Sequence, residues 1–212
     1  MQNMKQIILA LVLLVALPGC DDPNAKSVRT AFNASLNATG EEVLNFYSKA
    51  TFEQIERLAK IALKASRAEV QRLKPSDRLA VLQLRAQFNT TQLTKLSGRQ
   101  LIAELGDTVW WADDEFPPRV TKVRATDEWA NMDLEYRFSR RQKAKVTIRW
   151  VFEDNEWRVD DASMAAYQDR LVENFASDLG KSVDEAILYL IDDWYFGRGV
   201  PAAIWDRPVG GP

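Results

Sequence analysis

Hydrophobic and polar positions follow the period of a helix through the first half of the sequence. Across 41–73, apolar side chains recur at steps of three and four, which predicts amphipathic helices. Pro75 ends this run, and Ser76 is placed to cap a further helix. Shorter helices are expected at 90–96 and 98–105.

After residue 118 the period changes from about 3.6 to about 2. Apolar and polar side chains alternate over 130–138 and 144–152, the pattern of antiparallel strands with one apolar face. An earlier strand is expected at 119–125. The apolar face of the predicted sheet carries Met132, Leu134, Tyr136, Ile148, Trp150, Phe152 and Trp157. This face has to be covered, and the preceding helices are the expected cover.

Residues 154–155 are the candidate for a two-residue hairpin turn. A turn at this position pairs Phe152 with Trp157 and Trp150 with Val159, so that the apolar side chains share one face. A slip by one residue would move Trp157 to the other face, so the register is well specified.

The C-terminal part returns to helical spacing. A helix over 182–196 has apolar residues on one side, up to Trp194, and that side could dock on its own domain or on another protein. Residues 201–212 are expected to form a tail. The sequence therefore predicts the α+β class, with N-terminal helices packed on an antiparallel sheet and additional helices over 163–200.

Residues 1–19 have the features of a secretory signal peptide. Lys5 gives a basic start, and an unbroken apolar run of eleven residues follows from Ile7 to Leu17. A membrane-spanning helix needs about 20 such residues, so this run is too short to span a bilayer by itself.

The segment 17–20, Leu-Pro-Gly-Cys, resembles the lipobox of bacterial lipoproteins. The resemblance implies that Cys20 receives a diacylglycerol on its sulfur and, after cleavage, becomes an N-terminus carrying acyl chains such as palmitate. Two or more acyl chains anchor a protein stably, so the chain is expected on a membrane, facing the periplasm or the cell exterior. Asp21 resembles the inner-membrane retention signal of enteric-type lipoproteins and favours that membrane. Residues 20–40 are expected to be a flexible tether.

In the predicted order, helices precede an antiparallel sheet, and residues 151–160 read Val-Phe-Glu-Asp-Asn-Glu-Trp-Arg-Val-Asp. On these two features, residues 41–162 resemble the nuclear transport factor 2-like superfamily. The resemblance implies a curved sheet that wraps around helices to form a cone, in which enzymes of the superfamily often use Asp, His or Tyr. No catalytic residue is carried over from it.

The composition narrows the available chemistry. The sequence has no His and one Cys, which excludes Ser-His-Asp and Cys-His catalysis, an internal disulfide framework and the usual zinc and haem sites. With 28 basic and 30 acidic residues, the chain has no general electrostatic attraction to nucleic acid. Neither a metal nor a cofactor is expected. About 190 residues follow the signal, enough for one core and too few for two.

Two groups of side chains are candidates for function. Tyr136 is predicted to point into the cone, where a neighbouring carboxylate could act as a general base or could simply cap a turn; the candidates are Asp107, Asp113, Asp114, Asp160 and Asp161. The second group is aromatic and either fills the core or contacts a cavity or partner: Trp110, Trp111, Tyr136, Trp150, Trp157 and Trp194.

These observations lead to three hypotheses. The first is a non-enzymatic, membrane-tethered envelope protein that binds another envelope component, such as a protein, or assists assembly. The second is a carrier or sensor of a small apolar ligand, a lipid or acyl group, in the cone. The third is an acid/base enzyme that uses an Asp-Tyr pair. A filled interior favours the first, an open apolar cavity the second, and an open cavity with a buried carboxylate near Tyr136 the third.

Overall fold

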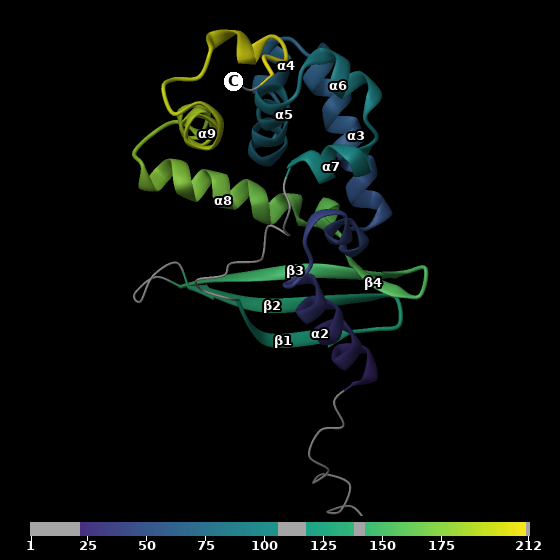
Figure 1. Ribbon diagram of the computed structural model, residues 1–212. Helices are drawn as coiled ribbons and strands as arrows, with labels where there is room; N and C mark the ends of the chain where they lie inside the picture. The colour runs from purple at the N-terminus through teal and green to yellow at the C-terminus, as the bar shows by residue number, and fades with distance from the viewer. Residues whose placement is uncertain (1–21, 106–117, 138–142, 211–212) are drawn as a thin grey trace, which may run out of the picture.

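The computed structural model describes residues 22–105, 118–137 and 143–210 and arranges them in two lobes (Figure 1). The sheet lobe consists of the antiparallel sheet with α2 and η1, and the helical lobe holds the remaining α-helices together with η4. The predicted α+β class is confirmed, with helices before the sheet and further helices after it.

The elements of the described residues follow the predicted order. The strands are β1 Arg119–Ala125, β2 Trp129–Arg137, β3 Lys143–Glu153 and β4 Glu156–Val159. The α-helices are α2 Pro23–Ser35, α3 Lys49–Lys64, α4 Arg67–Gln71, α5 Pro75–Gln87, α6 Thr90–Lys95, α7 Gly98–Leu105, α8 Ala165–Asp178 and α9 Val183–Ile191. Shorter helical turns are η1 Gly40–Phe46, η2 Asp161–Met164, the π-helix η3 Asp192–Phe196 and η4 Ala202–Trp205.

The strands pair in the order β1-β2-β3-β4, each antiparallel to the next. The predicted hairpin is confirmed: Phe152 pairs with Trp157 and Trp150 with Val159. The backbone of residues 154–155 has φ angles of 52° and 65°, the left-handed conformation that a tight hairpin turn requires.

The sheet is uncurled, where a curved sheet was expected. Strong curvature needs long strands bent by bulges. The register shifts between Val120 and Lys122 in the outer strand β1, whereas the two long central strands pair without a shift. The bulge is therefore confined to one edge of the sheet, and β4, with only four residues, is too short to wrap around a helix at the other edge.

Buried apolar side chains fill the covered face of the sheet. Met132, Leu134 and Ile148 are completely buried there, as is Trp150. Phe152 is an exception to the predicted apolar face, because it is 42% exposed. Its ring rests against Trp157 at the hairpin end of the sheet, with ring centroids 5.1 Å apart.

Residues 23–35 form helix α2, where part of a flexible tether was expected. The Asp22 side chain caps this helix by accepting from the backbone N–H of Asn24, and Pro23 occupies its first turn. Val28 and Phe32 lie one helical turn apart and are buried against the sheet. The tether prediction was wrong here because this short polar segment has an apolar stripe that the sheet covers.

The helical lobe has a hydrophobic core of its own, where a single core was expected. The helices expected to cover the sheet pack mainly on one another, and residues on both sides of position 162 contribute. Its buried side chains include Leu58, Val81, Leu82, Leu84, Phe88, Leu101, Val172, Ile187, Ile191 and Ile204. The apolar side of α9 therefore docks within the chain, which answers the question that its spacing left open.

Helix α3 joins the two lobes. At its start the Thr51 hydroxyl donates to the carbonyl oxygen of Val159 at 3.3 Å and accepts from the backbone N–H of Asp161 at 3.0 Å. The Ser48 backbone N–H donates to the same Val159 oxygen at 2.9 Å. These bonds tie the first turn of α3 to the end of β4, while the rest of the helix runs into the helical lobe (Figure 1).

Helix α5 begins at Pro75, so Ser76 is not its N-cap as expected. Instead, the backbone N–H and the hydroxyl of Ser76 both donate to a carboxylate oxygen of Asp169 in α8, at 2.9 and 2.6 Å. A carboxylate from a distant helix thus satisfies the start of α5, which local sequence could not indicate.

Close contact between α3 and α7 leads to the first prediction. A Cβ atom added at Gly98 would lie 2.2 Å from the backbone oxygen of Phe52. We expect Gly98→Ala to lower the free energy of unfolding by about 1–3 kcal/mol, because one of the helices must shift. Urea denaturation measures this loss. Glu104→Ala, at an exposed position of α7, is the control and should change stability by less than about 0.5 kcal/mol; equal stability of the two variants would contradict the prediction.

Candidate binding hollow in the helical lobe

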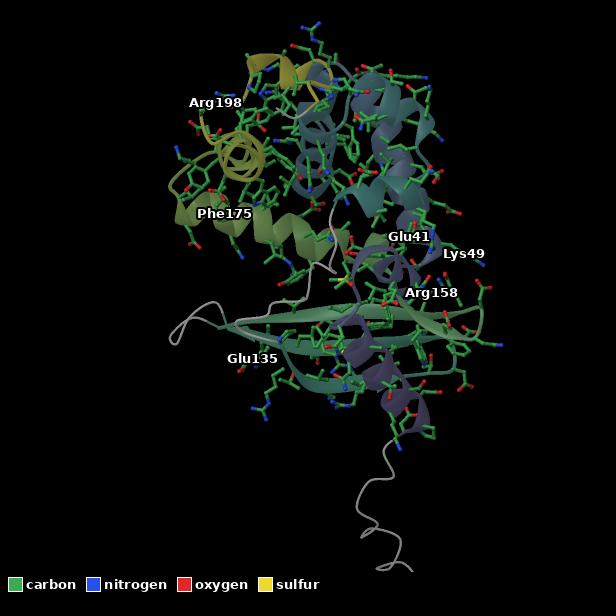
Figure 2. The ribbon with its side chains drawn as sticks, in the orientation of Figure 1. Glu41, Lys49, Glu135, Arg158, Phe175 and Arg198 are labelled. Atoms are coloured by element: carbon green, nitrogen blue, oxygen red, sulfur yellow. The ribbon has the colours of Figure 1, made fainter. Side chains whose placement is uncertain are left out.

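A hollow of about 630 Å³ opens on the helical lobe where three separate segments meet. The turn between α5 and α6, the π-helix η3 and the C-terminal segment line it with Gln87, Asn89, Gln92, Trp194, Tyr195, Val209 and Gly210. Figure 2 shows Arg198, from the turn that follows η3, at the outer end of this lobe, away from the sheet that carries Glu135 and Arg158.

The π-helix η3 carries the two aromatic side chains that line the hollow, Trp194 and Tyr195. Helix α9 starts at a capping box between Ser182 and Glu185 and widens into η3 after Ile191. The segment ends where the backbone N–H of Gly197, at a φ of 65°, donates to the oxygen of Asp192 at 2.7 Å. Such widened turns are frequent at functional sites.

The Tyr195 hydroxyl is fixed from both sides. It accepts from Nε2 of Gln83 at 2.9 Å and donates to Oε1 of Gln87 at 3.2 Å. Gln87 in turn donates to the backbone oxygen of Glu104. Burial raises the pKa of Tyr195 above its usual value, so the phenol stays neutral at physiological pH.

A capping box shapes the edge formed by α6. The side-chain oxygen of Asn89 accepts from the backbone N–H of Gln92, and the side-chain oxygen of Gln92 accepts from the backbone N–H of Asn89, each at 3.0 Å. Because both oxygens are used in this way, the amide nitrogens Nδ2 of Asn89 and Nε2 of Gln92 are the groups left to donate to a ligand.

The C-terminal segment lines the hollow and packs on the helical lobe, where a tail was expected over 201–212. Ile204 is completely buried and Trp205 is 4% exposed. The backbone N–H of Val209 donates to the backbone oxygen of Arg85 at 2.8 Å, and that of Gly210 donates to the same oxygen at 3.3 Å. These contacts fix Val209 and Gly210 beside the α5–α6 turn.

The structure separates the predicted aromatic candidates. Trp194 lines the hollow and is 48% exposed. Trp150 and Trp157 are core residues, at 0% and 5% exposure. Trp110, Trp111 and Cys20 lie outside the described residues, as does the side chain of Tyr136, whose backbone pairs with Ala144 in the sheet.

The predicted acid/base candidates have structural roles where the structure describes them. The Asp160 side chain accepts from the backbone N–H of Ser163 at the start of η2, and Asp161 accepts from the side-chain amide of Gln168 at 2.9 Å. The other three candidates, Asp107, Asp113 and Asp114, lie outside the described residues. The Asp-Tyr pair therefore stays a prediction.

Sequence reasoning missed most of the hollow. Gln87, Asn89 and Gln92 were not among the candidates, and neither were Val209 and Gly210 of the C-terminal segment. One local signal was visible, since Asn89 and Gln92 have the spacing of a capping box. That spacing predicts a helix start, and it does not indicate that η3 lies opposite.

A second hollow, of about 430 Å³, has a different character. Its lining includes Glu53 and Lys74 and the ion pair between Arg57 and Asp77, in which the nearest charged atoms are 3.2 Å apart. Its charged lining suits water and ions, and that ion pair already joins α3 to α5.

The described residues offer little for a metal or a membrane span. Within 22–105, 118–137 and 143–210, no three carboxylate or thiol side chains cluster as metal ligands would. No helix in the same ranges has both the length and the apolar character needed to cross a bilayer.

No family model matches the chain, and neither a curated protein nor a solved structure is significantly similar to it.

Proposed function

We propose that this protein is an exported, lipid-anchored envelope protein whose folded part is a non-catalytic binding module. The observation that carries the anchor is the position of the only cysteine in the sequence, Cys20, at the acceptor position of the lipobox-like segment. The hollow beside Trp194 supports the binding role, because its lining residues carry no charge and no group suited to acid/base chemistry at neutral pH.

Packing of the sheet favours this role over a carrier with an apolar cavity. The apolar face of the sheet is filled by α2 and η1, and Phe32 meets Trp150 edge-on with ring centroids 6.4 Å apart. A lipid or acyl group bound at this face would have to displace these side chains. A binding surface on the helical lobe needs no such rearrangement.

Anchoring at Cys20 would bring the sheet lobe close to the bilayer. Asp22 already caps α2, and two residues span at most about 7 Å of extended chain. The first turn of α2 is fixed to the turn between β1 and β2, since the side-chain amide of Asn24 donates to the carboxylate of Asp127 at 2.8 Å. Figure 1 shows this end of α2 on the side of the sheet away from the helical lobe. The hollow would therefore face away from the membrane.

The anchor is tested by replacing Cys20 with alanine in a bacterial host. We expect Cys20→Ala to move the protein from the membrane fraction to the soluble fraction and the native mature chain to carry acyl groups in its intact mass. Asp21→Asn, which leaves the lipobox-like segment unchanged, is the matched control and should remain in the membrane fraction. A mature native chain without fatty acids would refute the proposal, as would Cys20→Ala that fractionates like the native chain.

A further inference from the structure

We infer that the hollow beside Trp194 binds a neutral oligosaccharide, with the indole ring stacked on a sugar and the amides of Asn89 and Gln92 donating to its oxygens. The inference rests on the proposed binding role of the folded part and does not depend on the lipid anchor. Charge, hydrogen-bond inventory and aromatic geometry each support it.

The charge of the lining selects a neutral ligand. All seven residues that line the hollow are uncharged, and the raised pKa of Tyr195 keeps its phenol neutral. A phosphate, a carboxylate or an ammonium group would find no opposite charge among these side chains. Sugars satisfy this condition because their hydroxyl and acetamido groups are polar and neutral.

The hydrogen-bonding groups of the lining favour a ligand that is rich in acceptors. The oxygens of Asn89 and Gln92 are occupied by the capping box, which fixes the orientation of both side-chain amides. Each amide nitrogen therefore keeps donors that the capping box does not use, on a side chain that lines the hollow and is already held in place. Hydroxyl and acetamido oxygens of a sugar are suitable acceptors for such donors.

The exposed indole ring of Trp194 favours a ligand with a flat apolar face. Trp194 is 48% exposed, and its ring meets the ring of Tyr195 edge-on, at a centroid distance of 6.4 Å and an angle of 86°. Tyr195 is itself fixed by Gln83 and Gln87, so the indole is backed by a rigid neighbour. Pyranose rings have apolar C–H faces and polar edges, which match an indole surrounded by amides.

A proline-rich peptide is the strongest rival ligand. Such peptides bind grooves lined by several aromatic side chains. The hollow presents one exposed indole together with a rim of amides, and a volume of about 630 Å³ suits a short oligosaccharide. The observations therefore favour a sugar.

Isothermal titration of the full chain, purified in a detergent without a sugar headgroup, tests the inference. The probes are the tetramer of N-acetylglucosamine, cellotetraose and a proline-rich decapeptide. We expect at least one oligosaccharide to bind and Trp194→Ala to weaken this binding about tenfold or more. Tyr189→Ala is the matched control, because Tyr189 is 52% exposed on the neighbouring helix and does not line the hollow; its affinity should equal that of the native chain.

Two further variants separate a ligand contact from a structural role. Asn89→Asp and Gln92→Glu keep the oxygens of the capping box and remove one amide donor each. We expect each to weaken oligosaccharide binding about fivefold while the thermal midpoint of unfolding is unchanged or higher. No binding of either oligosaccharide, binding of the peptide alone, or affinity unaffected by Trp194→Ala would overturn the inference. None of these results would change the fractionation expected for Cys20→Ala, so this inference can fail while the proposed lipid anchor stands.

Discussion

Replacing Arg85 with methionine is expected to lower the free energy of unfolding by roughly 3–5 kcal/mol. Arg85 lies in α5 and its side chain is completely buried. Its guanidinium Nε donates to the oxygen of Ala62 at 2.7 Å, and Nη1 donates to the oxygen of Ile204 at 3.1 Å. The guanidinium also donates to the backbone oxygens of Ala65 and Trp205.

The four acceptors explain why this buried cation is tolerated. Ala62 and Ala65 lie at the C-terminal end of α3, the negative end of that helix, which ends at Lys64. Burial lowers the pKa of Arg85 and nearby Asp206 raises it, but an arginine keeps its proton at neutral pH. Methionine fills similar volume and leaves these carbonyl oxygens without a donor, and an unsatisfied buried polar group costs about 1–3 kcal/mol.

The measurement is urea denaturation combined with amide hydrogen exchange. Arg85→Met should lose protection first in residues 202–210, because the guanidinium holds the oxygens of Ile204 and Trp205. Arg72→Met replaces an exposed arginine of the same lobe and should change stability by less than about 0.5 kcal/mol. Arg85→Lys should fall between native and Arg85→Met, since an ammonium group keeps some of the donors but cannot reach all four acceptors around the edges of the guanidinium. Native stability and native protection of 202–210 in Arg85→Met would contradict the prediction.

The elements that could be predicted from the sequence depend on neighbouring residues. The hairpin at 154–155 follows from alternation on both sides of a two-residue turn, and its register follows because Trp157 must share a face with Trp150. Strand β1 likewise occupies the predicted range, 119–125. Periodicity and turn chemistry act over a few residues, so they can be recognised without knowledge of the partners.

The elements that could not be predicted depend on partners far along the chain. Arg85 lies in α5, which is packed against α3, α8 and α9, and its side chain is completely buried. A charged residue in an amphipathic helix is normally expected to face solvent, so the sequence pattern alone predicts the wrong environment. The hollow joins residues 87–92, 194–195 and 209–210, and no local pattern indicates that these three segments meet. Trp194 could be named as a candidate from its residue type, whereas its amide neighbours could not.

Helix α2 lies between these cases. The capping Asp22, the proline that follows it and the spacing of Val28 and Phe32 are all local signals of a helix. They were outweighed by polar composition and by the position of the segment directly after the lipobox-like motif. The structure shows that a single apolar stripe is enough when a sheet face is available to cover it.

Phe32→Ala is expected to destabilise the sheet lobe by roughly 3–5 kcal/mol, because α2 supplies part of its core. Phe32 is 1% exposed, and its ring meets the completely buried Trp150 edge-on. Truncation removes the aromatic contact and leaves a cavity between α2 and the sheet. A flexible tether would carry no such cost, so this variant discriminates between the two interpretations of residues 23–35.

Amide exchange of the paired strands β2 and β3 gives the most direct measurement. Met132 and Ile148 pair at the centre of the sheet, directly under the covered face, so their amides report opening of this lobe. Leu171→Ala, at a position of α8 that is 44% exposed, is the control and should leave these amides protected. Phe32→Leu should lose less than half as much stability as Phe32→Ala, since leucine keeps most of the apolar volume. If Phe32→Ala leaves the β2 and β3 amides as protected as in the native chain, α2 is not part of the core, and residues 23–35 could again be the flexible tether expected from the sequence.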